Sequence, residues 1–466
     1  MAHTHDIIVI GAGAGGLTAA GGCAMLGLRV ALIERGAMGG DCLNTGCVPS
    51  KALIAAAHRA HQMKTSDKFG IKSVVPKIDF QAVHDHVQRA IDTIAPVDSQ
   101  EHFEEMGCEV IRGSAELTGR HNVRVNGRDL TAPRIVLAVG SKPMVPPILG
   151  LSDVDYLTNE SIFDLTACPD HLMIMGAGPI GMEMAQSFVR LGAKVTVISI
   201  GTPMENDDPE AAAIAVASLE GEGVIFIQSA VTGVAPGITL ALANGQSVSG
   251  SHLLVATGRR VDFTGLGLEA AGVVHDKHGI QVDARRRTSN KHIYAVGDCR
   301  PGPHFTHASG YEGSNIVLEV ALGLPTKADY RALPWVTYLD PEIAQVGMTE
   351  GQARAAYGDK VTSWKEEFAD NDRAIAEGDT RGFVKLIKKG GALVGATIVG
   401  RHAGDLLLGP AMAISAKKST FGIASLIFPY PNRSEHLKKA AFASHDAMVF
   451  NAYTRRWAKF ITGLRR

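Results

Sequence analysis

The sequence predicts an α/β protein in which two similar strand–turn–helix units precede a C-terminal region of a different kind. A short apolar run followed by a glycine-rich turn occurs twice, near residues 7 and 171, and no such turn occurs after residue 334. With 466 residues, 45% hydrophobic and 20% charged, the chain is long enough for about three globular domains. Its net charge of -1 predicts no broad electrostatic field for nucleic acid.

The first glycine-rich turn has the features of a dinucleotide-binding fingerprint. The apolar run Asp6–Ile10 leads into Gly11-Ala12-Gly13-Ala14-Gly15-Gly16, then a helical pattern, then a strand pattern that ends at Glu34. In this motif Gly11 makes a tight turn, Gly13 lets a pyrophosphate approach the backbone, and Gly16 packs helix against strand. Glu34 can hydrogen-bond a ribose hydroxyl. The glycines alone are a weak signal, but strand, helix and carboxylate together predict a binding site.

A pair of cysteines follows in the stretch from Gly39 to Lys51, where Cys42 and Cys47 are separated by four residues. Two thiols this close can form a disulfide that an electron donor opens and closes. The start of a helix carries partial positive charge and Lys51 adds a full one, so a thiolate at Cys47 should be stabilised. Taken alone, the stretch also fits a loop with two buried thiols. Of six cysteines only these two are close in sequence, which favours a reducing compartment with one working disulfide.

The region between the two glycine turns is expected to contain helices over 52–63 and 80–106 and strands over 109–140. The helical part has five histidines, but no cysteine or carboxylate completes a set of metal ligands, so we expect no metal. The last strand pattern ends at Gly140, and the prolines after it predict a linker.

The second glycine-rich turn repeats the first. The strand pattern His171–Met175 leads into Gly176-Ala177-Gly178-Pro179-Ile180-Gly181 and a helix, and the next strand brings Ser199 to the offset that Glu34 has in the first copy. Without a carboxylate there, no negative side chain at this position repels the 2′-phosphate of NADPH. No Arg or Lys lies between Ser199 and Asp208 to bind that phosphate, so NADPH is only slightly favoured over NADH. Glu183, just past the turn, should lie under a bound nicotinamide; a first-turn acidic residue also simply suits a helix start.

Two further strand ends follow. The pattern Leu253–Arg260, which contains Gly258, closes the second unit as the strand before Gly140 closes the first. A strand from Ile293 then ends at Asp298, which can hold a sugar-like polyol, although a Gly-Asp turn is more often only a turn. A helix is expected to begin close to Thr306.

The C-terminal region from Pro334 mixes strands and helices and reads as a separate domain. Its last segment, Tyr453–Arg466, places aromatic and aliphatic residues on one helical face and basic residues around the other. Docking on its own globule and docking on an anionic membrane surface or a partner both fit this pattern. No apolar run approaches the roughly 20 residues of a membrane span, and Met1–Asp6 leads directly into a strand, so we expect a cytoplasmic protein.

These stretches resemble the flavoprotein pyridine nucleotide-disulfide oxidoreductases, the group of glutathione reductase, dihydrolipoamide dehydrogenase and mercuric reductase, over nearly the whole chain. The stretch Gly39–Lys51 is similar to the family's GGTCLNxGCxPSK, and Gly11–Glu34 and Gly176–Glu183 are similar to its two dinucleotide motifs. Gly297-Asp298 is similar to the family's flavin motif and Asp340–Glu350 to its interface domain. The segment Ile94–Ser99 looks most like mercuric-reductase-like members.

The resemblance implies two Rossmann-like domains that bind FAD and NAD(P), followed by a C-terminal α+β dimerisation domain, in a homodimer. The expected boundaries are 1–150 for the FAD domain, 151–270 for the NAD(P) domain, 271–333 for a central domain that completes the FAD site, 334–450 for the interface domain, and 451–466 for a basic amphipathic tail.

The resemblance also implies roles for residues. Cys47 takes the flavin-facing role and Cys42 exchanges with substrate, while Lys51, paired with Glu183, stabilises negative charge on the reduced flavin. The residues expected to contact FAD are Gly11, Gly13, Gly16, Glu34, Lys51, Ala115, Gly140, Asp298 and Thr306. Those expected to contact NADPH or NADH are Gly176, Gly178, Gly181, Glu183, Ser199 and Gly258.

Three departures from the family pattern affect the substrate side. The motif HPTxxE, whose histidine comes from the partner subunit, reads Tyr430-Pro431-Asn432-Arg433-Ser434-Glu435, so Glu435 is present and Tyr430 replaces the histidine. A tyrosine, with a pKa of about 10, donates a proton but seldom accepts one. Asp41 replaces the threonine before Cys42, which should raise the thiol pKa if the carboxylate is ionised and close. No cysteine follows Cys299, so the C-terminal cysteine pair of mercuric reductases is missing.

Three functions remain compatible with the sequence. The first is a FAD-dependent enzyme that passes electrons from NAD(P)H through the Cys42–Cys47 disulfide to a disulfide or dithiol substrate. The second is a diaphorase-like or mercuric-reductase-like flavoprotein that reduces quinones, metals or other acceptors. The third is a non-catalytic flavin redox sensor docked by its tail.

Overall fold

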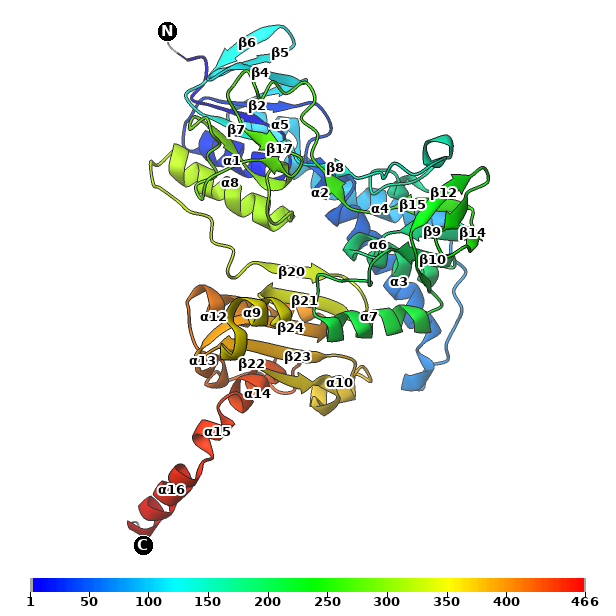
Figure 1. Cartoon of the computed structure of the whole chain (residues 1–466), viewed down its shortest axis with the longest axis vertical. Coiled ribbons are helices and arrows are strands. Elements are labelled where there is room, and N and C mark those ends of the chain that lie inside the picture. The colour runs from blue at the N-terminus through cyan, green and yellow to red at the C-terminus, as the bar shows by residue number, and fades with distance from the viewer. Residues whose placement is uncertain (1–2, 465–466) are drawn as a thin grey trace. The chain divides into compact units, whose positions relative to one another are not determined.

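The computed structural model describes residues 3–464, which form two compact units (Figure 1). Unit 1 comprises the described residues up to Asp67 together with Lys72–Ile200 and Val224–Ala328. Unit 2 comprises Lys68–Ile71, Gly201–Gly223 and the described residues from Asp329 onward.

The first fingerprint of unit 1 folds into a five-stranded parallel sheet in the order β19-β7-β1-β2-β3. The strands are β1 (Ile7–Ile10), β2 (Val30–Glu34), β3 (Cys108–Arg112), β7 (Ile135–Leu137) and β19 (Ile293–Ala295). The short apolar runs that predicted strands are buried, as parallel strands covered on both faces require. The segment 271–333 contributes β19, so this sheet is discontinuous in sequence.

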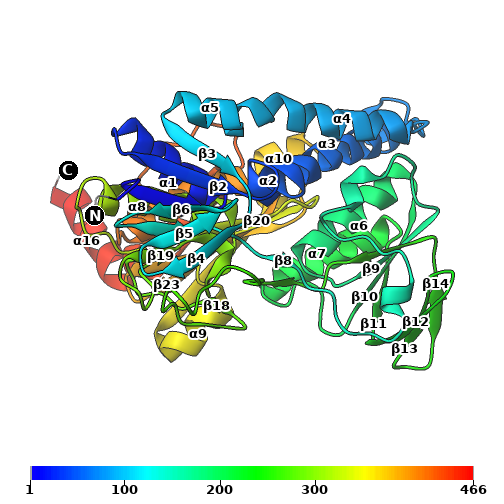
Figure 2. The same ribbon diagram turned by 90° about the horizontal axis from the view of Figure 1, so that it is seen from above.

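Two helices, α1 (Ala14–Met25) and α8 (Thr306–Val320), lie side by side against this sheet (Figures 1 and 2). They approach closely because glycines of α1 face α8. A Cβ added at Gly15 would lie 2.5 Å from Ser309 Oγ, and one at Gly22 would lie 2.6 Å from a methyl carbon of Val317. This contact fixes where α8 begins relative to the glycine-rich turn.

A three-stranded antiparallel sheet covers part of the same core. It consists of β4 (Ala115–Gly119), β5 (Asn122–Val125) and β6 (Arg128–Thr131). Along β5 the burial alternates, with Val123 and Val125 buried and Asn122 and Arg124 exposed, as the sequence pattern predicts.

The helical part follows the cysteines. Its helices are α2 (Gly40–Asn44), α3 (Cys47–Lys64), α4 (Phe80–Ile94) and α5 (Gln100–Glu105). The helix expected over 80–106 is interrupted by a 3₁₀ turn at Ala95–Asp98, which contains Pro96. Ser99 then caps α5, because its Oγ accepts a hydrogen bond from His102 N at 3.2 Å. Figure 2 shows α3 and α4 running side by side.

The second fingerprint forms a four-stranded parallel sheet in the order β11-β10-β9-β15, also within unit 1. Its strands are β9 (His171–Met175), β10 (Lys194–Ser199), β11 (Ile225–Gln228) and β15 (His252–Val255), and α6 (Pro179–Leu191) follows β9. The antiparallel strands β12 (Val231–Ala235), β13 (Thr239–Leu242) and β14 (Ser247–Ser249) form an adjoining sheet. Short antiparallel pairs are β8 (Lys142–Pro143) with β16 (Arg259–Arg260), and β17 (His275–Asp276) with β18 (Gly279–Ile280).

Unit 2 is built on a five-stranded antiparallel sheet in the order β20-β21-β24-β23-β22. The strands are β20 (Pro334–Thr337), β21 (Glu342–Gly347), β22 (Val361–Glu367), β23 (Phe383–Lys389) and β24 (Ala392–Gly400). Its helices are α7 (Pro209–Gly221), α9 (Glu350–Tyr357), α10 (Asp372–Ala376), α11 (Ala403–Leu406), α12 (Leu408–Ser415), α13 (Thr420–Ala424) and α14 (Glu435–Ala443). Helix α7 belongs here because Lys385 on β23 bonds to Asp208 at 2.8 Å and to Glu210 at 2.5 Å.

The chain continues through α15 (Asp446–Val449) into α16 (Ala452–Leu464), which confirms the helix expected in the tail. Arg466, the last residue of that expected segment, lies outside the described residues. Within residues 3–464 no helix is both long and apolar enough to cross a membrane.

Candidate active site

The residues expected at the first dinucleotide site gather at one edge of the first sheet. Gly11 follows β1, Glu34 ends β2, Gly140 follows β7 and Asp298 follows β19. These strands are parallel neighbours, so their carboxyl ends meet at the same edge, where open α/β sheets bind nucleotides. Ala115 is buried at the first position of β4, and Thr306 is the first residue of α8.

The glycines of this turn have the geometry that a dinucleotide requires. Gly11 has φ +105°, and a Cβ there would lie 2.3 Å from Ala138 O. A Cβ at Gly16 would lie 1.9 Å from Gly11 O, whereas one at Gly13 would meet no atom within 4 Å. Space is therefore open at the one glycine that should face a pyrophosphate. The Glu34 carboxylate is already held there, because it accepts hydrogen bonds from Ala12 N and Gly36 N, both at 2.6 Å.

The second turn repeats this geometry almost unchanged. A Cβ at Gly176 would lie 2.3 Å from Ala256 O, one at Gly181 would lie 2.1 Å from Gly176 O, and one at Gly178 would meet nothing within 4 Å. Ser199 ends β10 and Gly258 follows β15, so both lie at the carboxyl edge of the second sheet. The two copies are thus alike in backbone and differ in the residue at the offset of Glu34 and Ser199.

The turn that carries Asp298 is held by a buried ion pair that the sequence did not reveal. Glu312 on α8 accepts hydrogen bonds from Gly297 N at 2.8 Å and from Arg300 Nε at 2.9 Å, and both charged side chains are almost completely buried. Removing one partner of such a pair typically costs about 3–5 kcal/mol. The pair therefore positions Asp298 from the protein interior.

Both cysteines are free thiols, with Cys42 in α2 and Cys47 at the start of α3. Cys47 is the first residue of α3, and its Sγ lies 3.3 Å from Thr306 Oγ1, the first side chain of α8. The sulfur therefore lies at the starts of two helices, where partial positive charge stabilises a thiolate. The sequence predicted the contribution of α3 but not that of α8.

Hydrogen bonding divides the two thiols into a thiolate and a thiol. The hydrogen bond from Cys42, with further contributions from Thr306 and Lys51, lowers the pKa of Cys47 to about 6 against the effect of burial. The hydrogen bond to Cys47, together with burial, raises the pKa of Cys42. The hydrogen bond between the two sulfurs, with Thr306 and Lys51, therefore favours the negative charge on Cys47 and the proton on Cys42.

The predicted pair of Lys51 and Glu183 is present. Lys51 Nζ, one turn into α3, donates to Glu183 Oε2 at 2.9 Å, and Glu183 is nearly buried on α6 while Lys51 is about one-third exposed. This contact links the helix that carries Cys47 to the helix that follows the second glycine turn.

The carboxylate beside the cysteines is not the one that the sequence indicated. Asp41 pairs instead with Arg259, whose Nε donates to Ser141 Oγ at 2.7 Å. The carboxylate that raises the pKa of Cys42, after its bond to Cys47 and burial, is Asp98. Asp98 comes from the 3₁₀ turn that interrupts the expected helix. Arg259 therefore offsets the charge of Asp41.

Tyr430 and Glu435 lie in unit 2. Tyr430 is 72% exposed, its hydroxyl donates to Asp372 Oδ2 at 2.8 Å, and this bond raises the pKa of Tyr430. Glu435 begins α14 and accepts from Asn432 N at 3.3 Å. The neighbouring His436 cannot act as a base in place of the tyrosine, because it is buried and its ring nitrogens bond to Asn371 at 3.0 Å and to Glu367 O at 2.8 Å.

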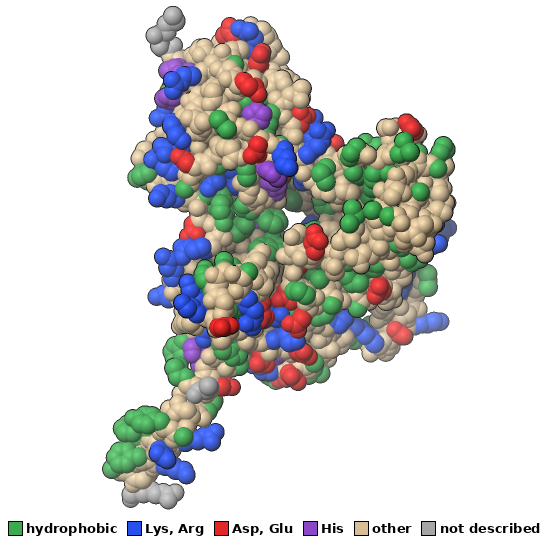
Figure 3. All heavy atoms as spheres, viewed as in Figure 1, with side chains coloured by type: hydrophobic (Ala, Val, Ile, Leu, Met, Phe, Trp, Pro, Cys, Tyr) green, Lys and Arg blue, Asp and Glu red, His purple; other side chains and the backbone are tan. Residues whose placement is uncertain are grey.

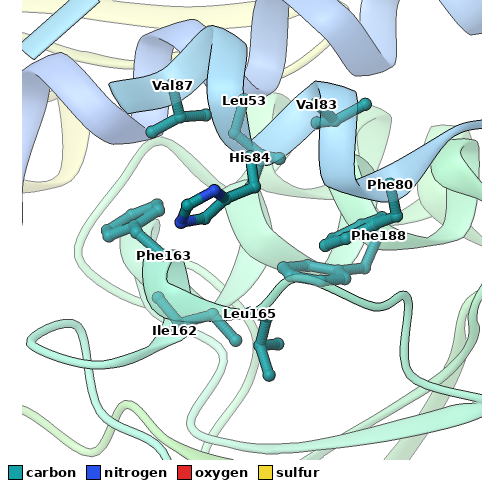
Figure 4. A pocket seen from close by; sticks show the side chains of 9 residues that line it. All are labelled: Leu53, Phe80, Val83, His84, Val87, Ile162, Phe163, Leu165 and Phe188. Atoms are coloured by element: carbon teal, nitrogen blue, oxygen red, sulfur yellow. The ribbon is translucent and has the colours of Figure 1, made fainter. Parts of the chain in front are cut away.

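An apolar pocket in unit 1 was not predicted from the sequence (Figure 4). Figure 4 shows His84 as the one ionisable side chain among its lining residues. The lining residues are Leu53, Phe80, Val83, His84, Val87, Ile162, Phe163, Leu165 and Phe188. None of them belongs to the dinucleotide or cysteine sites. Across the described part of the chain, no group of three or more His, Cys, Asp or Glu side chains is arranged to hold a metal ion.

Two dinucleotide sites beside one dithiol define an electron-transfer enzyme that works on sulfur. The chain belongs to the pyridine nucleotide-disulphide oxidoreductase family, which matches residues 5–313, and the family's dimerisation domain matches residues 333–441. It is therefore a homodimeric, FAD-dependent oxidoreductase that uses NAD(P)H.

Relatives of known activity span nearly the whole chain. A mercuric reductase of Streptomyces lividans is 35% identical over 458 residues, which cover 95% of this chain and 96% of the relative. A dihydrolipoyl dehydrogenase of Geobacillus stearothermophilus is 35% identical over 451 residues, which cover 94% of this chain and 95% of the relative.

Solved structures give the same result. The HOCl-induced flavoprotein disulfide reductase RclA of Escherichia coli has a TM-score of 0.84 and 27% identity, covering 94% of this chain and 99% of that one. LpdA of Mycobacterium tuberculosis has a TM-score of 0.86 and 26% identity over the same shares of the two chains. These similarities support electron transfer from NAD(P)H through FAD to a disulfide.

Proposed function

We propose that this enzyme reduces a small-molecule or protein disulfide through Cys42 and Cys47, with Cys42 as the sulfur that meets the substrate. The observation that carries the proposal is the location of Cys47 Sγ at the starts of α3 and α8, 3.3 Å from Thr306 Oγ1. A sulfur held there as a thiolate is suited to the flavin-facing role, which leaves the protonated Cys42 to exchange.

The residues that would hold FAD are those gathered at the edge of the first sheet: Gly11, Gly13, Gly16, Glu34, Ala115, Gly140, Asp298 and Thr306, together with Lys51. Those that would hold NAD(P)H are Gly176, Gly178, Gly181, Glu183, Ser199 and Gly258. The open space at Gly13 and Gly178 suits both dinucleotides. FAD, when bound, supplies the two-electron relay between nicotinamide and disulfide, and the Lys51 ammonium, oriented by Glu183, offsets negative charge beside it.

The sulfur exchange then takes place in two steps. Cys42 loses its proton and attacks the substrate disulfide, which forms a mixed disulfide and releases one substrate thiol. The Cys47 thiolate attacks Cys42 Sγ, which closes the Cys42–Cys47 disulfide and releases the second thiol. The dithiol is oxidised by two electrons and the substrate disulfide is reduced by two. One proton comes from Cys42 and the other from solvent.

Reduction of quinones or metal ions is the second candidate function. It is favoured because residue 430 is a tyrosine and not a side chain that accepts a proton near neutral pH. A tyrosine whose pKa is raised above 10 cannot take the proton of Cys42 near neutral pH. Acceptors that need no sulfur exchange avoid this step. In both proposals the enzyme works in the cytoplasm. The segment 451–466 is available to hold it at a membrane surface or a partner. A non-catalytic flavin redox sensor is the least favoured of the three functions.

Anaerobic NADPH is expected to convert the pair to two thiols. Of the six cysteines, four lie outside the pair, so the oxidised protein, denatured without reductant, should show four thiols and the NADPH-reduced protein six. The Cys42→Ser/Cys47→Ser variant should show four in both states. Four thiols in the NADPH-reduced native protein, with the flavin reduced, would exclude the disulfide role.

Ser199→Glu is expected to lower kcat/KM for NADPH by about tenfold or more relative to NADH, because a carboxylate at the end of β10 repels a 2′-phosphate. Steady-state kinetics with both nucleotides measures this ratio, and Ser199→Ala is the matched control for loss of the hydroxyl. An unchanged ratio in Ser199→Glu would place the 2′-hydroxyl site elsewhere.

A further inference from the structure

We infer that α16 attaches this enzyme to anionic lipid surfaces as a helix lying in the plane of the membrane. The inference goes beyond the proposed redox function and does not depend on it.

The first observation is the division of the helix into two faces. Tyr453, Trp457, Phe460 and Leu464 recur at helical spacing on one side, and Arg455, Arg456 and Lys459 lie on the other. Figure 3 shows this division, with hydrophobic side chains on one side of the helix and basic ones on the opposite side. Such a pattern is typical of helices that bury one face just below the lipid headgroups.

The second observation is that the chain itself leaves the apolar face uncovered. Tyr453, Trp457, Phe460 and Leu464 are all more than half exposed, and no described residue of α16 is buried. Trp457 and Phe460 lie next to each other, with ring centroids 5.6 Å apart. The expectation that the tail docks on its own globule is therefore not met within this chain. Aromatic side chains with one apolar and one polar end are favoured at the membrane interface.

The third observation is the positive charge of the tail, which favours an anionic lipid surface over a second copy of the chain as its binding partner. After Asp446 the sequence has five basic residues and no acidic one, although the whole chain has a net charge of -1. In a symmetric contact of tail with tail, these basic groups would repel each other. They match instead the negative surface of anionic lipids, to which each Lys or Arg contributes about 1 kcal/mol, or roughly fivefold in affinity.

The fourth observation is the extent of the family's dimerisation domain. Its match ends at residue 441, before α15 and α16 begin. The helix thus lies outside the part of the chain that matches the dimerisation domain, and it is not long and apolar enough to span a bilayer.

The test uses the full-length, FAD-loaded protein and cosedimentation with vesicles. We expect binding to vesicles of phosphatidylcholine mixed with phosphatidylglycerol, weaker binding as salt is raised, and little binding to phosphatidylcholine alone. The variant R455E/R456E/K459E should bind at least about 100-fold more weakly, because three attractive charges become repulsive. The control K277E/K327E/K418E changes the net charge equally at three other exposed lysines and should bind like the wild type.

A second variant and its control test how much the apolar face of α16 contributes to vesicle binding. Trp457→Ser with Phe460→Ser should also weaken vesicle binding, whereas Leu149→Ser with Val75→Ser, two residues more than 80% exposed elsewhere, should not. Bound FAD and retained NAD(P)H oxidation show that each variant is folded. Equal binding to neutral and anionic vesicles, equal losses in the controls, or no binding at all would overturn the inference. So would dissociation of the dimer by the tail variants without any lipid binding, which would assign the helix to a second copy.

Discussion

Replacing Cys42 by serine is expected to lower turnover of any disulfide substrate by at least about 1,000-fold while NAD(P)H-dependent quinone reduction continues. A serine hydroxyl can donate the hydrogen bond that Cys42 makes to Cys47, but it cannot attack a disulfide. A quinone needs no sulfur exchange, so the path that reaches it is unaffected. Parallel assays with a disulfide and a quinone measure the two rates in one preparation.

Cys168→Ser is the matched control for loss of a thiol. Cys168 is partly buried, and its sulfur donates a hydrogen bond to the backbone oxygen of Leu191 at 3.9 Å, away from the Cys42–Cys47 pair. Both activities should survive this change. If Cys42→Ser instead retains full disulfide turnover, sulfur exchange at Cys42 is not the physiological step, and the second candidate function takes its place.

The parts of this site that the sequence predicts are those encoded locally. Gly11 and Gly176 are glycines because their backbones turn against a neighbouring strand end, where a Cβ would lie 2.3 Å from a carbonyl oxygen. That requirement follows from a few consecutive residues, so the motif reveals it. The position of Cys47 at a helix start is local in the same way, since a glycine precedes it and a proline follows it.

The parts that the sequence does not predict depend on contacts between distant residues. Thr306 reaches Cys47 across 259 positions of the chain, and Arg259 reaches Asp41 across 218. Nothing in the local pattern of Asp41 shows that a guanidinium offsets its charge, so the sequence does not reveal that Asp98 is the carboxylate that acts on Cys42. The 3₁₀ turn that brings Asp98 near Cys42 did have a local signal, because Pro96 has no backbone N–H and cannot continue the α-helical hydrogen bonding.

Replacing Tyr430 by histidine is expected to raise turnover of a small disulfide or dithiol substrate by about 100-fold at pH 7. The HPTxxE motif that this stretch resembles has, at this position, a histidine that shuttles a proton for the exchanging sulfur, and the glutamate of the motif is present as Glu435. Cys42 needs such a base, because its bond to Cys47 and its burial raise its pKa. Tyr430 cannot serve, since its hydroxyl bonds to Asp372 and its pKa lies above the usual value.

The pH profile separates a new proton acceptor from a change in packing. A histidine accepts a proton only in its neutral form, so the gain should appear as pH rises through about 6.5 and disappear below it. Tyr430→Phe, which removes the hydroxyl but adds no base, should change the rate little and add no such step. Because Tyr430 is largely exposed, neither substitution should disturb the fold. If Tyr430→His gives no gain at any pH, the slow step is not removal of the Cys42 proton, and the natural acceptor of this enzyme is then one that needs no base at residue 430.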